Sequence, residues 1–323
     1  MSSFAVLGEA LIDLRVVDGA APREQGRPAA RGYTAQPGGS PFNVAVGLAR
    51  LGRRTRFAGR FAQDALGAIL RRHAEQSGVA LRLSGTWRGP SPAALFDLAE
   101  DGSARYEFHL GDAGESLFSA AEAARIDPAA VDAAHFGSLA SWLPGSADAV
   151  LDAAARLRRR GVFVSYDPNI RAMLIADRGA AAERVARAAD VSHLIKASAE
   201  DLGWLYPELS PADAAGKLLA HGPLAVVVTH GPDGADCYSP TGRVHGGSAP
   251  VEVVDTVGAG DAFMAGLLDG LAASHALSAD AFAGLLRADA DVAGLLDAAC
   301  AHAAATCARP GADPPWRETI AAA

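Results

Sequence analysis

The sequence has few cysteines and no arrangement of them that suits a disulfide framework or a zinc site. Its three cysteines are Cys237, Cys300 and Cys307, and their spacing matches neither pattern. Cys300 and Cys307 are seven residues apart on one face of a predicted helix, so we expect core packing for them rather than chemistry. This usage of cysteine suits a reducing cytoplasm.

The sequence also lacks an excess of basic residues and any long apolar run. It has 29 Lys and Arg against 37 Asp and Glu, a formal net charge of -8, which argues against broad binding to nucleic-acid phosphates. No segment approaches the run of about 20 apolar residues that spans a membrane. No basic leader precedes the first apolar run, so a signal peptide is not expected. We expect a cytoplasmic protein with neither nucleic acid nor membrane as a partner.

Short apolar runs alternate with alanine-rich stretches over most of the chain. The apolar runs predict buried strands at 4–14, 55–61, 133–139, 162–167, 191–197 and 224–230. The stretches between them predict helices at 41–52, 65–78, 146–161, 180–189 and 211–222. Because strands that alternate with helices form βα units, the pattern predicts an α/β fold with a mostly parallel sheet covered on both faces.

Two early regions, about 14–37 and 86–112, interrupt this alternation. In the second region, AALFDLAEDGSARYEFHL places Asp-Gly between two runs of alternating apolar and polar residues, which indicates a β-hairpin. Both regions are inserted between βα units, so we expect them to pair into a small sheet that forms a lid. No low-complexity linker divides the chain, and we expect residues 1–323 to form a single domain.

A glycine-rich loop precedes a predicted helix near the C-terminus. Gly258, Ala259 and Gly260 lie directly before Asp261 in VVDTVGAGDAFMAGLL. Such a loop lets backbone N–H groups approach a ligand, and the helix N-terminus favours an anion. The pattern indicates an anion hole beside a carboxylate, although an N-cap aspartate after a glycine-rich turn would give the same sequence.

Two further motifs carry polar side chains at strand or helix ends. In QPGGSPFNVAVGLARLG, Gly38 and Gly39 allow close approach to a ligand, and Asn43 offers donors and an acceptor for vicinal hydroxyls. A turn or capping role is the alternative for Asn43. SYDPNIR ends a predicted strand and places Asp167, Asn169 and Arg171 at the edge where open α/β sheets bind ligands. Neither a P-loop nor a dinucleotide-binding G-x-G-x-x-G motif is present.

These motifs resemble the signatures of a known family. GGSPFNVAVGLARLG resembles the first signature, and DTVGAGDAFMAGLL the second signature, of the PfkB or ribokinase-like carbohydrate kinases. GEALIDL, DPNIR and VVVTHGPDG extend the likeness over nearly the whole chain. The resemblance implies a ribokinase-like three-layer α/β/α domain with a small β-sheet lid. It also implies transfer of the γ-phosphoryl group of ATP to a sugar hydroxyl, with Mg²⁺.

The resemblance further implies a role for each motif residue. Asp261 would be the base, and the amides of Gly258, Ala259 and Gly260 would form the anion hole. The implied substrate-binding residues are Asp13, Gly38, Gly39, Asn43, Phe108, Asn169 and Arg171. The implied nucleotide-binding residues are Lys196, Ser198, Thr229, Gly231 and Gly234. Glu200 or Asp201 would serve Mg²⁺, directly or through water. A turn residue, a core aromatic and a helix cap are the alternatives for Asp13, Phe108 and Ser198 respectively.

Within the family, the motifs look most like those of bacterial fructokinases, which makes D-fructose the first expected substrate and fructose 6-phosphate the product. A 2-keto-3-deoxygluconate kinase, a ribokinase or another sugar or sugar-acid kinase is the alternative, since Arg171 would suit a carboxylate. A catalytically silent sugar- or nucleotide-binding regulator is the alternative from another class. Ala62 and Leu66 replace the family's usual glycine and phenylalanine. Activation by a monovalent cation and a homodimer through the lid remain open.

Overall fold

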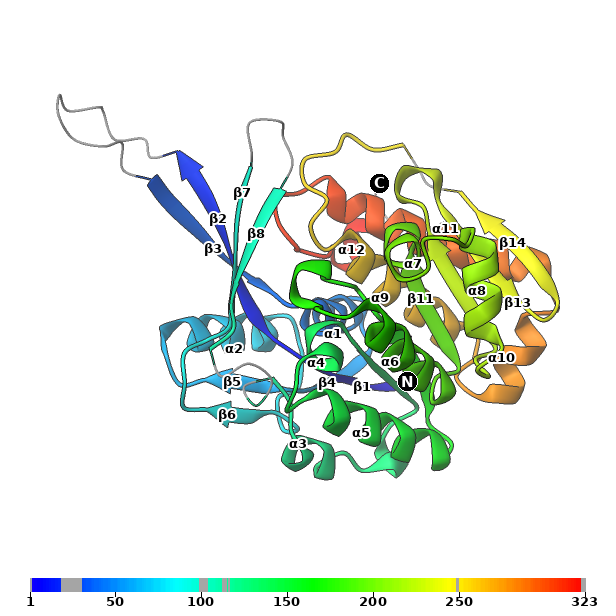
Figure 1. Cartoon of the computed structure of the whole chain (residues 1–323), viewed down its shortest axis with the longest axis horizontal. Helices are drawn as coiled ribbons and strands as arrows, with labels where there is room; N and C mark the ends of the chain where they lie inside the picture. The colour runs from blue at the N-terminus through cyan, green and yellow to red at the C-terminus, as the bar shows by residue number, and fades with distance from the viewer. Residues whose placement is uncertain are drawn as a thin grey trace.

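The structure is a computed structural model that describes residues 2–18, 31–98, 104–111, 115, 117–247 and 250–320. Within these residues an eight-stranded sheet has the order β14-β13-β12-β11-β10-β9-β1-β4 (Figure 1). Its strands are β1 (Ser3–Leu7), β4 (Arg54–Ala58), β9 (Ala133–Gly137), β10 (Phe163–Asp167), β11 (Leu194–Ser198), β12 (Ala225–Thr229), β13 (Ala235–Ser239) and β14 (Gly242–Gly246). The pairs from β4 to β12 are parallel, and β13 and β14 add an antiparallel edge.

Side chains that alternate along the strands enter two separate cores. On β1, Phe4 and Val6 belong to one core, and Ala5 and Leu7 belong to the other, because successive strand residues point to opposite faces. The first core also contains residues of α1 (Ser40–Arg50), α2 (Ala65–Gln76), α9 (Ala259–Ala273), α10 (Ala279–Leu285) and α11 (Asp289–Cys307). The second contains residues of α5 (Ala147–Arg159), α6 (Arg178–Asp190), α7 (Ala199–Leu205) and α8 (Pro211–Leu219). The predicted three-layer α/β/α fold is confirmed.

A second sheet of four strands projects from the central domain (Figure 1). It has the order β3-β2-β7-β8 and consists of β2 (Leu11–Asp18), β3 (Arg31–Gly38), β7 (Ala93–Leu98) and β8 (Ala104–His109). Both regions for which a lid is predicted contribute strands to this small sheet. Parts of those regions, residues 19–30 and 99–103, lie outside the described residues, and the function of the sheet as a lid stays a prediction.

Two predicted strand boundaries were wrong. Residues 4–14 form two strands in different sheets, because the chain turns between β1 and β2. At this turn Gly8 has a φ of 149°, and a Cβ there would lie 2.5 Å from Pro41 Cγ of α1. Residues 86 and 87 do not join the small sheet, since β6 (Gly85–Trp87) pairs with β5 (Arg60–Ala62). Ala62, one of the two departures from the family pattern, is buried on β5.

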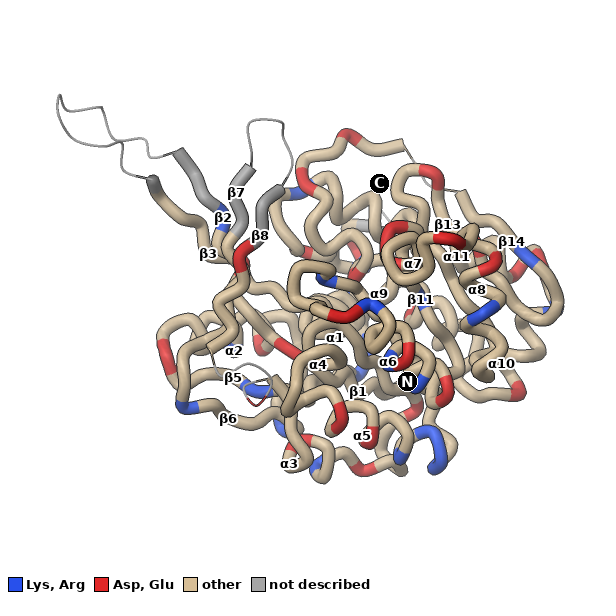
Figure 2. Tube along the Cα trace, in the orientation of Figure 1, with Lys and Arg blue, Asp and Glu red and all other residues tan. Residues whose placement is uncertain are grey.

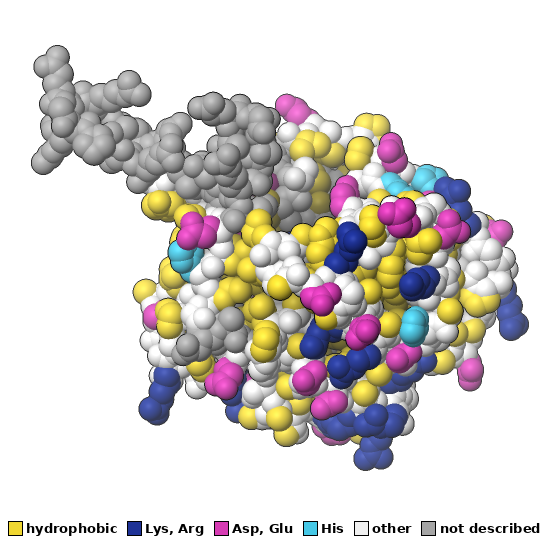
Figure 3. Space-filling model, viewed as in Figure 1, with side chains coloured by type: hydrophobic (Ala, Val, Ile, Leu, Met, Phe, Trp, Pro, Cys, Tyr) yellow, Lys and Arg dark blue, Asp and Glu magenta, His cyan; other side chains and the backbone are white. Residues whose placement is uncertain are grey.

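Charges of both signs occur on the outer helices α5, α6 and α8 (Figure 2). On the face shown in Figure 3, basic side chains gather at the lower edge of the molecule. Three short helices complete the described chain: α3 (Ala120–Ala124), α4 (Ser138–Trp142) and α12 (Arg317–Ile320). Among the described residues, no helix is both long and apolar enough to cross a membrane.

Candidate active site

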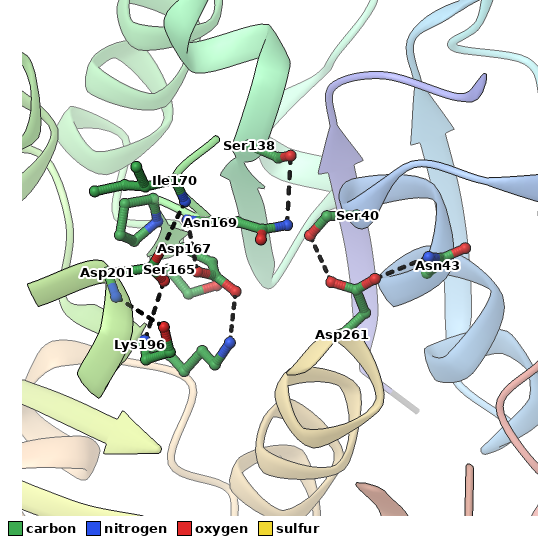
Figure 4. A network of polar contacts seen from close by, with 12 residues as sticks. Ser40, Asn43, Ser138, Ser165, Asp167, Asn169, Ile170, Lys196, Asp201 and Asp261 are labelled. Atoms are coloured by element: carbon green, nitrogen blue, oxygen red, sulfur yellow. Dashed lines mark hydrogen bonds and ion pairs between the residues drawn. The ribbon is translucent and has the colours of Figure 1, made fainter. Parts of the chain in front are cut away.

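The carboxylate of Asp261 lies in the first turn of α9 and faces the first turn of α1. It is 8% exposed, and Figure 4 shows both of its oxygens engaged. Ser40 Oγ donates to Oδ1 at 2.6 Å, and Asn43 Nδ2 donates to Oδ2 at 2.8 Å. Burial raises the pKa of Asp261 above its ordinary value, and the two hydrogen bonds oppose that shift. Ser40 was not predicted as a site residue, and Asn43 donates to this carboxylate as well as lining the cavity described below.

The loop before Asp261 is made of small residues because two neighbours lie directly against it. Gly258 has a φ of 79°, and a Cβ there would lie 2.6 Å from Ala312 Cβ. A Cβ on Gly260 would lie 2.9 Å from Lys196 Nζ. The glycines therefore allow a left-handed turn at the helix start and leave room for an ammonium group beside the loop.

That ammonium group belongs to a buried network at the ends of β10 and β11. Lys196 Nζ donates to Asp167 Oδ2 at 3.0 Å, and the two side chains are 6% and 1% exposed. Burial lowers the pKa of Lys196, but the carboxylates of Asp167 and Asp201 outweigh burial, so the pKa lies above its ordinary value. Lys196 is therefore a charged group next to the Gly258–Asp261 loop. Asp167 was noted at the strand end but was given no role, because its bond to a lysine 29 residues away has no local signal in the sequence.

Asp201 joins this network, whereas Glu200 is exposed. Asp201 Oδ1 accepts from the backbone N–H of Ile170 at 2.8 Å, and Oδ2 accepts from that of Ser198 at 3.1 Å (Figure 4). Ser198 Oγ accepts in return from the N–H of Asp201, which makes a capping box at the start of α7. The structure therefore places Ser198 as a helix cap, and its contact with the nucleotide stays a prediction.

A small polar cavity of about 70 Å³ lies between the small sheet and the central domain. Of the predicted substrate-binding residues, Asp13, Gly39, Asn43, Phe108 and Arg171 line it. The other two lie next to lining residues. A Cβ on Gly38 would lie 2.1 Å from Asp13 Oδ2, and Asn169 Oδ1 accepts from Arg171 Nη1 at 2.6 Å.

The cavity lining contains three carboxyl groups, from Glu9, Asp13 and Asp261, and the guanidinium of Arg171. Burial and the nearby Asp261 raise the pKa of Asp13 to about 7, although Arg171 opposes the shift. Burial raises the pKa of Glu9 to about 6. A lining with this many acceptors suits a neutral ligand that donates hydrogen bonds, such as a polyol or a sugar. Glu9 was not predicted, because a single acid within a predicted strand gives no sequence signal.

A larger cavity of about 520 Å³ lies on the other side of the loop. Ala259 and Gly260 of the loop line it together with the predicted Thr229, Gly231 and Gly234. Most of its remaining lining is apolar and comes from Pro232, Pro250, Val251, Val253, Phe263, Ala303 and Ala304. Gly258 and Asp261 line the smaller cavity instead, so the four-residue loop separates the two cavities and contacts both.

The walls of this larger cavity also include two cysteines, for which core packing alone was expected. Cys300 does pack in the core on the α9 side of the sheet, yet both Cys300 and Cys307 line the cavity. Their spacing of seven residues on α11 puts both on the cavity side of the helix. Burial raises the pKa of Cys300 to about 11, so this thiol is protonated at neutral pH and contributes an apolar wall.

The sequence and the fold resemble those of known carbohydrate kinases. The model of the pfkB family carbohydrate kinases matches residues 1–319. A fructokinase of Rhizobium leguminosarum bv. trifolii is 35% identical over 84% of this chain and 80% of its own length. The crystal structure of a fructokinase with bound ATP from Xylella fastidiosa has a TM-score of 0.87 and 26% identity, and the match covers 99% of this chain and 97% of that one. An aminoimidazole riboside kinase of Salmonella typhimurium is 30% identical over 87% of this chain and 86% of its own length.

Proposed function

We propose D-fructose as the substrate of this chain, which belongs to the pfkB family of carbohydrate kinases and is an ATP-dependent sugar kinase. The product would be fructose 6-phosphate. The observation that carries the proposal is the pair of cavities that share the loop Gly258–Asp261. A nucleotide in the larger cavity and a sugar in the smaller one would place the γ-phosphoryl group and the sugar hydroxyl at the same loop.

The chemistry follows from the groups around this loop. The Asp261 carboxylate would accept the proton of the attacking hydroxyl as the new P–O bond forms and the bond to ADP breaks. Ser40 and Asn43 fix this carboxylate from α1. Because phosphoryl transfer has a loose transition state, it needs little activation of the nucleophile and mainly needs its negative charge neutralised. The loop amides and the Lys196 ammonium would supply that charge stabilisation.

The charge of the small cavity favours a neutral sugar over a sugar acid. A substrate carboxylate would enter a cavity with three carboxyl groups and one guanidinium in its lining. The guanidinium is already partly used, since Arg171 Nη1 donates to Asn169 Oδ1 and to the carbonyl of Ile170. Like charges at such short range disfavour binding. This is the argument for fructose over 2-keto-3-deoxygluconate.

The described residues also indicate how the predicted Mg²⁺ ion would be bound. Among the described residues, no group of three or more His, Cys, Asp or Glu side chains is arranged to bind a metal. Mg²⁺ in kinases is bound largely by nucleotide phosphates and water, with one or two carboxylates. The residues fit such an ion if Asp201 reaches it through water, because both Asp201 oxygens accept backbone N–H groups. When bound, Mg²⁺ would neutralise phosphate charge.

We also propose that a monovalent cation activates the enzyme, that the chain forms a homodimer through the small sheet and that the protein is cytoplasmic. Light scattering at working concentration tests the homodimer, and a monomer would remove it. Adding KCl in place of a tetramethylammonium salt at constant ionic strength tests activation by the cation.

The substrate is tested by measuring ADP release from MgATP with fructose, ribose, tagatose, 2-keto-3-deoxygluconate and aminoimidazole riboside. The expected result is the highest kcat/KM with fructose. A higher value with the sugar acid would contradict the charge argument, and a higher value with a riboside would move the assignment to a nucleoside kinase.

A further inference from the structure

A directed chain of hydrogen bonds runs beside the sugar cavity from Arg171 to Ser138, which lies next to Glu9. Arg171 Nη1 donates to Asn169 Oδ1 at 2.6 Å. Figure 4 shows the next bond, in which Asn169 Nδ2 donates to Ser138 Oγ at 3.4 Å. The Glu9 carboxylate lies next to Ser138, which stabilises the charged form of this carboxylate and so lowers its pKa, against the larger rise that burial causes. Both donors, on Arg171 and Asn169, point from the guanidinium toward the carboxylate, and such bonds polarise and strengthen one another.

Glu9 connects this series of hydrogen bonds to the backbone of the central domain. It is fully buried in the turn between β1 and β2, where the chain leaves the central sheet for the small sheet. Its carboxylate also accepts from the backbone N–H groups of Leu139 at 3.3 Å and Ala140 at 3.0 Å, at the start of α4. A single buried carboxylate thus fixes the backbone directly after Ser138.

The two middle members of the chain have an unfavourable backbone conformation. Among the described residues, only three other than glycine have a positive φ, and two of them are Ser138 at 54° and Asn169 at 38°. Left-handed backbone is disfavoured for residues with a Cβ, so the surroundings must maintain it. The ends of β9 and β10 also approach closely here, since a Cβ on Gly137 would lie 2.0 Å from the carbonyl oxygen of Asp167. Strain at two hydrogen-bonded residues beside a ligand cavity is typical of a preorganised site.

We propose that Glu9 and Ser138 are positioning residues that fix the Arg171 guanidinium at the sugar cavity and so set the affinity for the sugar. They act through Asn169, whose amide joins the serine to the arginine. The inference rests on the proposed function of the same cavity as the sugar site. It gives a role to two residues to which the sequence analysis assigned none.

The test uses Ser138→Ala, which removes the bridging hydroxyl, and Glu9→Gln, which leaves one acceptor where the carboxylate serves several donors. The control is Ser146→Ala, because Ser146 is a fully buried serine whose hydroxyl bonds only to the carbonyl of Leu143 among the described contacts. Each variant is measured for the KM of the sugar and of ATP, for kcat and for Tm. The sugar used is the one that the wild-type enzyme phosphorylates best.

In Ser138→Ala we expect the sugar KM to rise roughly five- to tenfold, which is the usual effect of losing a hydrogen bond in a charged network. The KM of ATP and kcat should stay within about twofold, and Ser146→Ala should leave all three constants unchanged. In an Arg171→Lys background, Ser138→Ala should change the sugar KM by less than about twofold, because residues that act in one network are not additive. Glu9→Gln should behave in the same way.

An unchanged sugar KM in Ser138→Ala, or the same fold-change with and without Arg171→Lys, would overturn the proposal. If Glu9→Gln does not fold, Ser138→Ala decides alone. A wild-type enzyme that does not phosphorylate fructose would contradict the proposed substrate. The same set of variants would then be measured with the preferred sugar. The two failures are therefore distinguishable.

Discussion

The two cavities on either side of the Gly258–Asp261 loop differ in size and in chemistry. The smaller, of about 70 Å³, has three acids and an arginine in its lining, whereas the larger, of about 520 Å³, is lined mainly by small and apolar side chains. Polar groups in fixed positions discriminate between hydroxyl patterns far better than apolar walls do. Under the proposed function, the choice of sugar would therefore be made in the smaller cavity, and the larger cavity would bind its ligand largely by shape.

The charged groups beside the loop also differ between its two sides. Asp261 faces the sugar side and is hydrogen-bonded from α1. Lys196 is paired with Asp167 and lies beside Gly260, next to the loop itself. A proton acceptor and a cation thus flank the loop where the phosphoryl group would pass. Substitutions on either side should have different kinetic signatures.

The largest expected effect is the fall in kcat of Asp261→Asn, at the loop between the two cavities. Removing a general base costs between a hundredfold and ten-thousandfold in rate, so kcat should fall about a thousandfold. The dissociation constants of sugar and ATP should stay within about threefold, because Asn keeps the size of the side chain. Rapid quench measures the chemical step, and calorimetry measures binding. An unchanged kcat in Asp261→Asn would show that this carboxylate takes no part in the chemical step.

Next in size is the effect of Gly258→Ala on folding. The left-handed φ of 79° and the approach of Ala312 Cβ within 2.6 Å of the added methyl group are both unfavourable. We expect the free energy of unfolding to fall by roughly 2 kcal/mol, measured by urea denaturation. The control is Gly284→Ala on α10, where an added Cβ meets nothing within 4 Å and stability should not fall. Equal stability of the two variants would show that the loop does not need glycine.

On the nucleotide side, Ala304→Phe should fill part of the apolar cavity. We expect the KM of ATP to rise roughly tenfold, about 1.4 kcal/mol, with the sugar KM unchanged. Ala298→Phe on the same helix is the control, since Ala298 is exposed and is absent from the cavity lining. A rise in the sugar KM of Ala304→Phe would mean that the two cavities are not independent.

The smallest expected effect is the contribution of Asp13, which lines the smaller cavity, to the pH dependence of stability. The folded protein raises the pKa of Asp13 to about 7, so between about pH 4 and pH 7 the folded state binds more protons than the unfolded state. The contribution of Asp13 to the free energy of unfolding should therefore fall as the pH rises through this window, and Glu9, with a pKa of about 6, contributes with the same sign. The Tm of Asp13→Asn relative to that of the wild type should therefore rise between pH 4 and pH 7. A difference in Tm that does not change with pH would contradict the raised pKa.

Much of the fold was predictable from local patterns. The alternation of apolar and alanine-rich segments gave the parallel strands and their helices, since burial on both faces requires that pattern. The break at Gly8 was not predictable, because an apolar run continues through it and only the approach of Pro41 shows why the chain turns. The hairpin β13–β14 was also missed, since GADCYSPTGRVHG has little apolar alternation.

The motifs indicated the loop and its aspartate, but the partners of these residues come from distant parts of the chain. Ser40 reaches Asp261 across 221 residues, and Leu139 reaches Glu9 across 130. A local pattern cannot indicate such a contact, because the contact depends on how strands order in the sheet. Cys300 and Cys307 show the same limit: their helical face was predictable, whereas the cavity beside that face was not.

The most direct test of the account is to identify the product formed from fructose and MgATP by ³¹P and ¹³C NMR. The account predicts ADP and fructose 6-phosphate in equal amounts, with no product from Asp261→Asn on the same time scale. Phosphorylation at another hydroxyl of fructose, or an equal yield from Asp261→Asn, would contradict the assignment of the small cavity and of its base.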